Sequence, residues 1–308
     1  MKLCKSTIAT TLYTAFFISS ISIANNFNTS VFDIDFDISM KQDSFYGWCM
    51  KTPHPDFYKA AFPREPIDLY NLLKELYKKN NLTSTPQNQN IRIPKIIHQI
   101  WLGGQLPDKL KAWQKTWIEK HPDWQYKLWT DDDAKTLNLY NHQLYLNIDR
   151  LASKADILSY EILYKFGGVY IDSDFECLRP LDILHYNYDF YVGVQPLDIN
   201  CLALGHGIVG CIPHHPIIKS CMEIQRNAFA NNAKIISEAF GPLVLTKAFL
   251  AIASINSEHI IALPSTYFYP LECTQKYFKQ TAIKNLCCPE SFGIHYWMDG
   301  SDCKDNSY

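Results

Sequence analysis

The sequence of 308 residues predicts an α/β fold, in which a mostly parallel sheet carries helices on both faces. Short apolar runs rich in β-branched residues alternate with segments whose apolar residues recur at helical spacing. The polar stretch TSTPQNQN (83–90) separates this alternating region, which begins near Ile91, from a helical segment before it. The content of 47% hydrophobic and 19% charged residues is that of an ordinary globular protein.

The N-terminus has the features of a secretory signal. Lys2 and Lys5 precede an uncharged stretch that runs to Ala24 and ends in small residues, as signal peptidase prefers. We therefore expect residues 1–24 to be a signal peptide that sends the protein into the secretory pathway or out of the cell. The alternative is an uncleaved signal anchor, through which the protein would associate with a membrane.

Residues 25–90 are expected to form an N-terminal extension and linker. Within them VFDIDFDI (31–38) alternates like an exposed strand, whereas residues 66–80 start with a proline and place leucines on one helical face. The sequence thus predicts a small helical extension, a main domain over residues 91–300 and a tail over residues 301–308.

The main domain is expected to alternate strands and helices. The expected strands are short, apolar runs at residues 94–103, 124–130, 168–172, 189–195, 260–264 and 292–297. The expected helices keep apolar residues three and four positions apart, at residues 107–122, 150–166, 216–230 and 242–254. Asp131–Asp133 can cap a further helix. Such alternation needs crossover connections, and these favour a parallel sheet.

Charge and cysteine spacing exclude two classes of function. A net charge of −2 lacks the basic surplus of a nucleic-acid-binding protein, so no nucleic-acid partner is expected. The ten cysteines include no C-x-x-C pair, which argues against a zinc ribbon.

The stretch GGVYIDSDFE (167–176) holds the main acidic candidates. Residues two apart in an extended chain share a face, so Asp172 and Asp174 would repel each other unless a cation or solvent lies between them. They follow the carboxyl end of an expected strand, where α/β sheets bind ligands. Aspartate oxygens suit Mn²⁺ or Mg²⁺. A solvated loop is the alternative for this pair, and Glu176 is expected to be exposed.

Four segments together resemble the D-x-D glycosyltransferases of family 32. They are IPKIIHQIWLGG (93–104), residues 152–182, GPLVLTKAF (241–249) and IHYW (294–297). That family includes initiating α-mannosyltransferases and inositol-phosphoceramide mannosyltransferases, and is distantly similar to glucosylating toxins. The resemblance spans about residues 91–300. It implies a GT-A (Rossmann-like) fold, a nucleoside-diphosphate sugar donor, Mn²⁺ or Mg²⁺, and transfer with retention to a glycan, glycolipid or protein acceptor.

The resemblance also implies ligand contacts outside the D-x-D motif. Ile100 and Trp101 would cradle the nucleotide base, with His98 nearby, although Trp101 could equally be a core residue. His295 would be a third metal ligand, its alternative being a hydrogen-bonded core histidine. Trp297 would approach the phosphates or the acceptor.

Three aspartates receive the catalytic assignments that the resemblance implies. Asp156, on the helix before the two glycines, would hold hydroxyl groups of the donor sugar; its alternative is a solvated helical carboxylate. Asp172 would contact the ribose, the sugar and a metal-bound water, and Asp174 would bind the metal directly.

The sequence departs from the resemblance at one position. Many relatives read D-x-x-R where this chain has Asp156 followed by Ser159, so a cation that helps to neutralise the donor is missing. Lys154 or Arg150 could compensate.

Two other classes of protein compete with a transferase. A metal phosphohydrolase also opens with D-x-D after a strand, but it requires Thr or Val where this chain has Phe175. A secreted, non-catalytic carbohydrate- or cation-binding protein would be consistent with the missing arginine.

Overall fold

The computed structural model describes residues 30–41, 66–82, 90–197, 202–230 and 241–298. The expected signal peptide and C-terminal tail lie outside the described residues, as does most of the expected linker. Within the described ranges, every helix is too short or too polar to cross a membrane.

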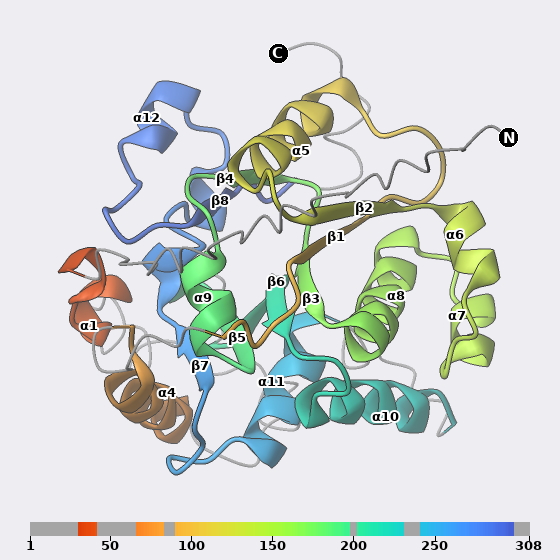
Figure 1. Ribbon diagram of the computed structural model, residues 1–308, viewed down its shortest axis with the longest axis horizontal. Coiled ribbons are helices and arrows are strands. Elements are labelled where there is room, and N and C mark those ends of the chain that lie inside the picture. Colours follow the sequence, from red (N-terminus) through yellow and green to blue (C-terminus); the bar gives the residue numbers. More distant parts are fainter. Residues whose placement is uncertain (1–29, 42–65, 83–89, 198–201, 231–240, 299–308) are drawn as a thin grey trace, which may run out of the picture.

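Six strands form the central sheet, in the order β2-β1-β3-β6-β5-β7 (Figure 1). Their bounds are β1 Ile96–Ile100, β2 Gln125–Trp129, β3 Gly168–Ile171, β5 Phe190–Val194, β6 Leu204–Cys211 and β7 Ile260–Leu263. β6 runs antiparallel to its neighbours β3 and β5, whereas the pairs β1–β2, β1–β3 and β5–β7 are parallel. The predicted α/β class with a mostly parallel sheet is confirmed.

A second sheet of two antiparallel strands lies at the end of β3. It consists of β4 (Phe175–Cys177) and β8 (Gly293–His295). The two strands come from distant parts of the sequence, so their pairing brings the C-terminal region next to the stretch that follows β3.

Helices cover both faces of the central sheet. The longer ones are α4 Pro66–Asn80, α5 Asp108–Lys120, α8 Leu151–Phe166, α10 Pro216–Ala230 and α11 Gly241–Ile252. The shorter ones are α1 Phe36–Ser39, α6 Asp131–Thr136, α7 His142–Asn147, α9 Asp182–Asn187 and α12 Gln280–Lys284. In β5, Phe190 packs against Phe249 of α11, and the next residue, Tyr191, hydrogen-bonds to His185 of α9. Because successive strand residues point to opposite faces, α11 and α9 lie on opposite sides.

Two glycines connect α8 to β3. Gly167 ends the helix with a φ of 63°, in the left-handed region that favours glycine. Gly168 follows with a φ of 88°, and a Cβ there would lie 2.6 Å from the carbonyl oxygen of Ile96 in β1. The glycines therefore allow β3 to pair closely with β1 immediately after the helix ends, which fixes where the residues after β3 emerge.

Replacing Gly168 by alanine is expected to lower the free energy of unfolding by roughly 3 kcal/mol or more, because backbone strain and a steric clash add together. Gly104 is the matched control: it also has a positive φ, of 129°, but a Cβ there would meet nothing within 4 Å. Gly104→Ala should therefore lose only about 1 kcal/mol. Urea unfolding of both variants tests this, and equal losses would contradict the tight β3–β1 approach.

The N-terminal extension differs from the sequence expectation. Residues 31–38 form no strand; the chain makes a 3-10 turn and then α1, which Asp35 caps through its side chain. Phe32 and Phe36 are both buried, and the ring of Phe32 stacks on Phe292 at 5.3 Å between centroids. Alternation predicts a strand, but Phe32 and Phe36 reach the core from two separate short helical segments, the 3-10 turn and the start of α1.

The strand β6 is absent from the sequence expectation. Its sequence, LGHGIVGC, contains three glycines, which weaken the strand signal. Two of them, Gly205 and Gly210, leave space for the rings of Tyr269 and Tyr191. The strand is nevertheless fully buried, and it carries His206 into the middle of the sheet.

Candidate active site

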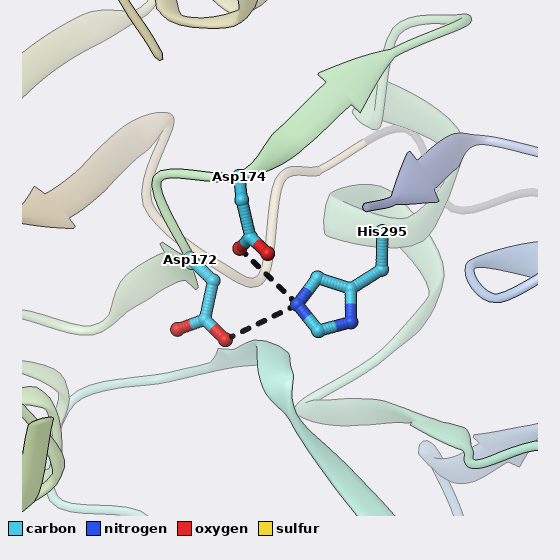
Figure 2. A group of neighbouring side chains, drawn as sticks. All are labelled: Asp172, Asp174 and His295. Atoms are coloured by element: carbon cyan, nitrogen blue, oxygen red, sulfur yellow. Dashed lines mark ion pairs between the residues drawn. The ribbon is translucent and has the colours of Figure 1, made fainter. Parts of the chain in front are cut away.

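Asp172, Asp174 and His295 gather where β3 ends (Figure 2). Asp172 directly follows β3, Asp174 directly precedes β4, and His295 of β8 pairs with Phe175 across the small sheet. Nε2 of His295 lies 3.2 Å from Oδ1 of Asp174 and 3.6 Å from Oδ2 of Asp172. Within the described residues, this is the group whose ligand atoms all lie within 4.8 Å of one another.

Each of the two aspartates is held by a hydrogen bond on its other oxygen. The hydroxyl of Tyr170 donates to Oδ1 of Asp172 at 2.6 Å, and the backbone N–H of Met298 donates to Oδ2 of Asp174 at 2.8 Å. One oxygen of each carboxylate is thus fixed by the protein, and the remaining two face the imidazole of His295. The arrangement is preorganised to receive a positive charge between the carboxylates.

The protonation of this group follows from its charges. Burial raises the pKa of Asp172, and the neighbouring carboxylate of Asp174 raises it further. Burial would also raise the pKa of Asp174, but its contacts with His295 and Met298 outweigh burial and lower it. Burial would lower the pKa of His295, yet the two carboxylates raise it. A proton on His295 therefore supplies the positive charge, and a metal ion would compete with that proton.

The donor set fits a divalent cation. Two carboxylate oxygens suit both Mn²⁺ and Mg²⁺, whereas the imidazole nitrogen is a ligand that transition metals accept more readily. Nε2 of His295 faces both carboxylates and is therefore the nitrogen placed for coordination, whereas the other ring nitrogen, Nδ1, is buried without a hydrogen-bond partner among the described residues. These three residues therefore suit Mn²⁺ at least as well as Mg²⁺.

Trp297 adopts a strained conformation beside His295. Its φ of 54° lies in the left-handed region, which is rare for a bulky side chain. The indole N–H donates to the carbonyl of Leu271 at 2.8 Å. The centroid of the indole ring lies 4.3 Å from the centroid of the His295 ring, in an edge-to-face arrangement. Trp297 thus packs against the imidazole and restricts its position.

Asp156 belongs to a second polar group. Oδ1 of Asp156, on α8, lies 3.1 Å from Nδ1 of His206, and Nε2 of His206 lies 2.9 Å from the hydroxyl oxygen of Ser159. The ring centroids of Tyr170 and His206 are 5.3 Å apart, and the hydroxyl of Tyr170 donates to Asp172. Tyr170 therefore connects the Asp156 group to the D-x-D aspartates.

His98 of β1 is buried and hydrogen-bonds to residues of neighbouring segments. It is 2% exposed, its Nε2–H donates to the carbonyl of Gly167 at 2.9 Å, and its Nδ1 accepts from the indole N–H of Trp129 at 3.1 Å. Burial lowers the pKa of His98 to about 4, so the ring is neutral. Both ring nitrogens are engaged within the protein, which leaves neither for a nucleotide.

The two residues at the end of β1 have different environments. Ile100 is buried, and its carbonyl accepts a hydrogen bond from the hydroxyl of Ser173 at 3.2 Å. Trp101 is partly exposed and lines a hollow of about 330 Å³ together with Gly104, Gln105, Leu106, Lys111, Gln114, Leu128 and Thr130. Because β1, β2 and β3 are parallel, this hollow lies at the same edge of the sheet as Asp172.

Glu176 differs from the sequence expectation, and Lys154 lies against a tyrosine ring. Glu176 is 9% exposed rather than solvated, because it accepts a hydrogen bond from the hydroxyl of Tyr296 at 2.6 Å and pairs with Lys284 of α12. The ammonium group of Lys154 lies 5.0 Å from the centre of the Tyr145 ring.

A family comparison matches part of the chain. Residues 107–191 match the family described as "Glycosyltransferase sugar-binding region containing DXD motif". The matched range includes Asp156, Asp172 and Asp174.

Several characterised proteins are similar over part of their length. Inositol phosphoceramide mannosyltransferase 3 of Schizosaccharomyces pombe is 43% identical over 108 residues, 32% of this chain and 29% of that protein. Inositol phosphoceramide mannosyltransferase 1 of the same yeast is 26% identical over 198 residues, 60% of each chain. The initiation-specific alpha-1,6-mannosyltransferase of Saccharomyces cerevisiae is 33% identical over 151 residues, 41% of this chain and 32% of that protein. The chain thus spans 29–60% of the length of these relatives, and the resemblance drawn from the sequence is confirmed.

Among solved structures, the PaToxG glycosyltransferase is similar with a TM-score of 0.45 at 18% identity, over 64% of this chain and 80% of that chain. So distant a likeness carries no argument about function.

Proposed function

We infer the function from the premise that the chain carries the DXD-containing sugar-binding region of family 32 glycosyltransferases. We propose that it transfers a hexose from a nucleoside-diphosphate sugar to a glycan or lipid-linked acceptor, with retention. The observation that carries this proposal is the group formed by Asp172, Asp174 and His295 directly after β3. A site for a cation at this edge of an α/β sheet is suited to a diphosphate leaving group.

The metal site would be formed by these three side chains. Bound there, Mn²⁺ or Mg²⁺ would act as a Lewis acid that neutralises charge developing on the departing diphosphate. The protein's own contribution is to hold the carboxylates in place through Tyr170 and Met298, so that little reorganisation is needed when the donor binds.

The donor would lie along the same edge of the sheet. The hollow beside Trp101 would receive the nucleotide base, since an aromatic side chain can stack on a base and the hollow contains several polar groups. Asp156, whose side chain is 23% exposed, would accept hydrogen bonds from sugar hydroxyl groups. Trp297 would stand close to the phosphates or the acceptor.

The relatives guide the choice of sugar and acceptor. Two of them are named inositol phosphoceramide mannosyltransferases and one an alpha-1,6-mannosyltransferase. We therefore propose mannose as the first donor sugar to test, with a glycolipid as the first acceptor class. The signal-like N-terminus supports action within the secretory pathway or outside the cell, and an uncleaved anchor would place the enzyme at a membrane.

A donor screen tests the function. The full chain is incubated with Mn²⁺ and a panel of GDP- and UDP-hexoses, and release of nucleoside diphosphate is measured with and without a glycolipid acceptor. Release from one donor, with an α-linked product from an α-linked donor by NMR, supports retaining transfer. Binding of a donor without release in the presence of any acceptor would instead favour the non-catalytic carbohydrate-binding alternative.

Metal binding gives a prediction that does not depend on turnover. Mn²⁺ titrated into the chain and followed by electron paramagnetic resonance is expected to bind more weakly, by at least about tenfold, after His295→Gln, because one ligand is lost. His142→Gln is the control, since His142 is exposed on α7.

Turnover should be as fast with Mn²⁺ as with Mg²⁺, or faster. Full turnover in excess EDTA would contradict the metal site.

A further inference from the structure

The hydrogen bonds around His206 determine its protonation state. The hydroxyl of Ser159 donates its single proton to the backbone carbonyl of Asp156, at 2.8 Å. Its oxygen can therefore only accept from Nε2 of His206, which must carry a hydrogen. Nδ1 faces the carboxylate of Asp156 and must carry a hydrogen as well. With both nitrogens as donors, His206 is an imidazolium.

The surroundings of His206 favour this charge. The residue is 5% exposed, and a buried cation needs a paired anion. Burial would lower the pKa of His206, but the Asp156 carboxylate and, more weakly, that of Asp172 raise it. The flanking rings belong to Tyr160 and Tyr170, and burial raises the pKa of both phenols well above the ordinary value, so they stay neutral.

The same three residues could be read as a serine–histidine–aspartate hydrolase. That chemistry needs a histidine nitrogen free to take the hydroxyl proton, and a serine that a substrate can reach. Here Ser159 is fully buried, its proton is directed to the carbonyl of Asp156, and Nε2 of His206 already carries a hydrogen. The group is therefore built to hold a charge and not to form a covalent intermediate.

Within the described residues, the other oxygen of Asp156 has no hydrogen-bond partner and can accept from a ligand. Oδ1 is bound to His206, whereas Oδ2 faces the start of α11, where a Cβ added to Gly241 would lie 3.6 Å away. A charge-assisted hydrogen bond to one oxygen of a carboxylate fixes the direction of the other. His206 thus determines where Asp156 can accept a hydrogen bond.

We propose that His206 is a positioning residue, a buried cation from β6 that aims Asp156 at the sugar of the donor and replaces the cation missing at Ser159. Ser159 completes the group, because its hydroxyl oxygen accepts the second N–H of the imidazolium. This inference rests on the proposed function for the identity of the ligand. The charge of His206 follows from its hydrogen bonds and does not depend on the proposed function.

The charge is tested directly by ¹⁵N NMR of the histidine side chains of the full chain at pH 7. Signals of His206, assigned by their loss in His206→Gln, are expected to show both ring nitrogens protonated. Ser159→Ala should shift the Nε2 signal, whereas Ser153→Ala, which removes another buried hydroxyl from α8, should not. A neutral His206 would overturn the proposal and leave the proposed function standing.

The positioning role is tested by comparing two ligands that differ only in the sugar. With Mn²⁺ present, His206→Gln is expected to weaken binding of GDP-mannose by roughly 10- to 100-fold, the size of a lost charge-assisted hydrogen bond, and to leave GDP binding unchanged. Equal weakening for both ligands would show a merely structural role and overturn the inference. If no nucleotide-sugar of the donor panel binds the wild-type chain more tightly than its own nucleoside diphosphate, the donor role of Asp156 fails. Failure to bind any nucleotide-sugar of the donor panel would overturn the proposed function itself.

Discussion

Replacing Asp174 by asparagine is expected to lower sugar transfer by about 1000-fold while the fold remains intact. The carboxylate is one of two that would hold the metal, and Lewis-acid stabilisation of a departing diphosphate is worth several kcal/mol. Asparagine keeps the shape of the side chain, but it has no charge with which to bind the ion or to pair with His295. Mn²⁺ affinity and turnover should therefore fall together.

The fold should tolerate this change because asparagine can keep the main structural contact of Asp174. Oδ2 accepts from the backbone N–H of Met298, and an amide oxygen can accept in the same position. Loss of one carboxylate also relieves its repulsion with Asp172. The melting temperature should therefore shift by only a few degrees, and Asp132→Asn is the control, since that aspartate is exposed on α6. Turnover within tenfold of the wild type would mean that Asp174 does not hold the metal.

Much of the local structure could be predicted from the sequence, because its causes are local. The helical spacing of α8, its end at Gly167 and the strand that follows are all encoded within about twenty residues. The same local pattern predicts the D-x-D aspartates at the end of a strand. The helix expected over residues 66–80 has the same bounds as α4.

The remainder depends on contacts between residues far apart in the sequence. His206 carries no motif, and its glycine-rich strand gives a weak signal, so its contact with Asp156 becomes visible only once β6 is inserted in the sheet. His98 matched the position of a nucleotide contact, but its neighbours Trp129 and Gly167 occupy both ring nitrogens. A single sequence shows neither partner.

Lowering the pH from 7 to 5 is expected to remove about 5 kcal/mol of folding free energy, because three buried histidines are neutral in the folded chain. Burial lowers the pKa of His98 and His215 to about 4, and that of His185 to about 3. Each uses a ring nitrogen as an acceptor: His215, for example, accepts from the backbone N–H of Ile217 at 3.2 Å. Protonation would break these bonds and bury an unpaired charge.

The direction of the effect follows from proton binding. Between the ordinary value of 6.5 and the lowered folded value, the unfolded chain binds a proton at each of these histidines and the folded chain does not. Their stabilisation is present above pH 6.5 and is lost as the pH falls toward 4, at about 2 kcal/mol for each histidine by pH 5. His206 and His295 have raised pKa values, so their stabilisation is present below pH 6.5 and is lost only as the pH rises through their folded values. They offset part of the acid loss.

Urea unfolding at several pH values, with one histidine removed at a time, assigns this slope. His215 lies directly before α10, where asparagine is a favoured cap, so His215→Asn can keep the hydrogen bond from Ile217 without a group that titrates. The variant should lose about a third of the pH dependence, whereas His142→Asn, at an exposed position, should keep all of it. A stability that is constant between pH 7 and 5, or an unchanged slope in His215→Asn, would show that these histidines are not held neutral by the fold.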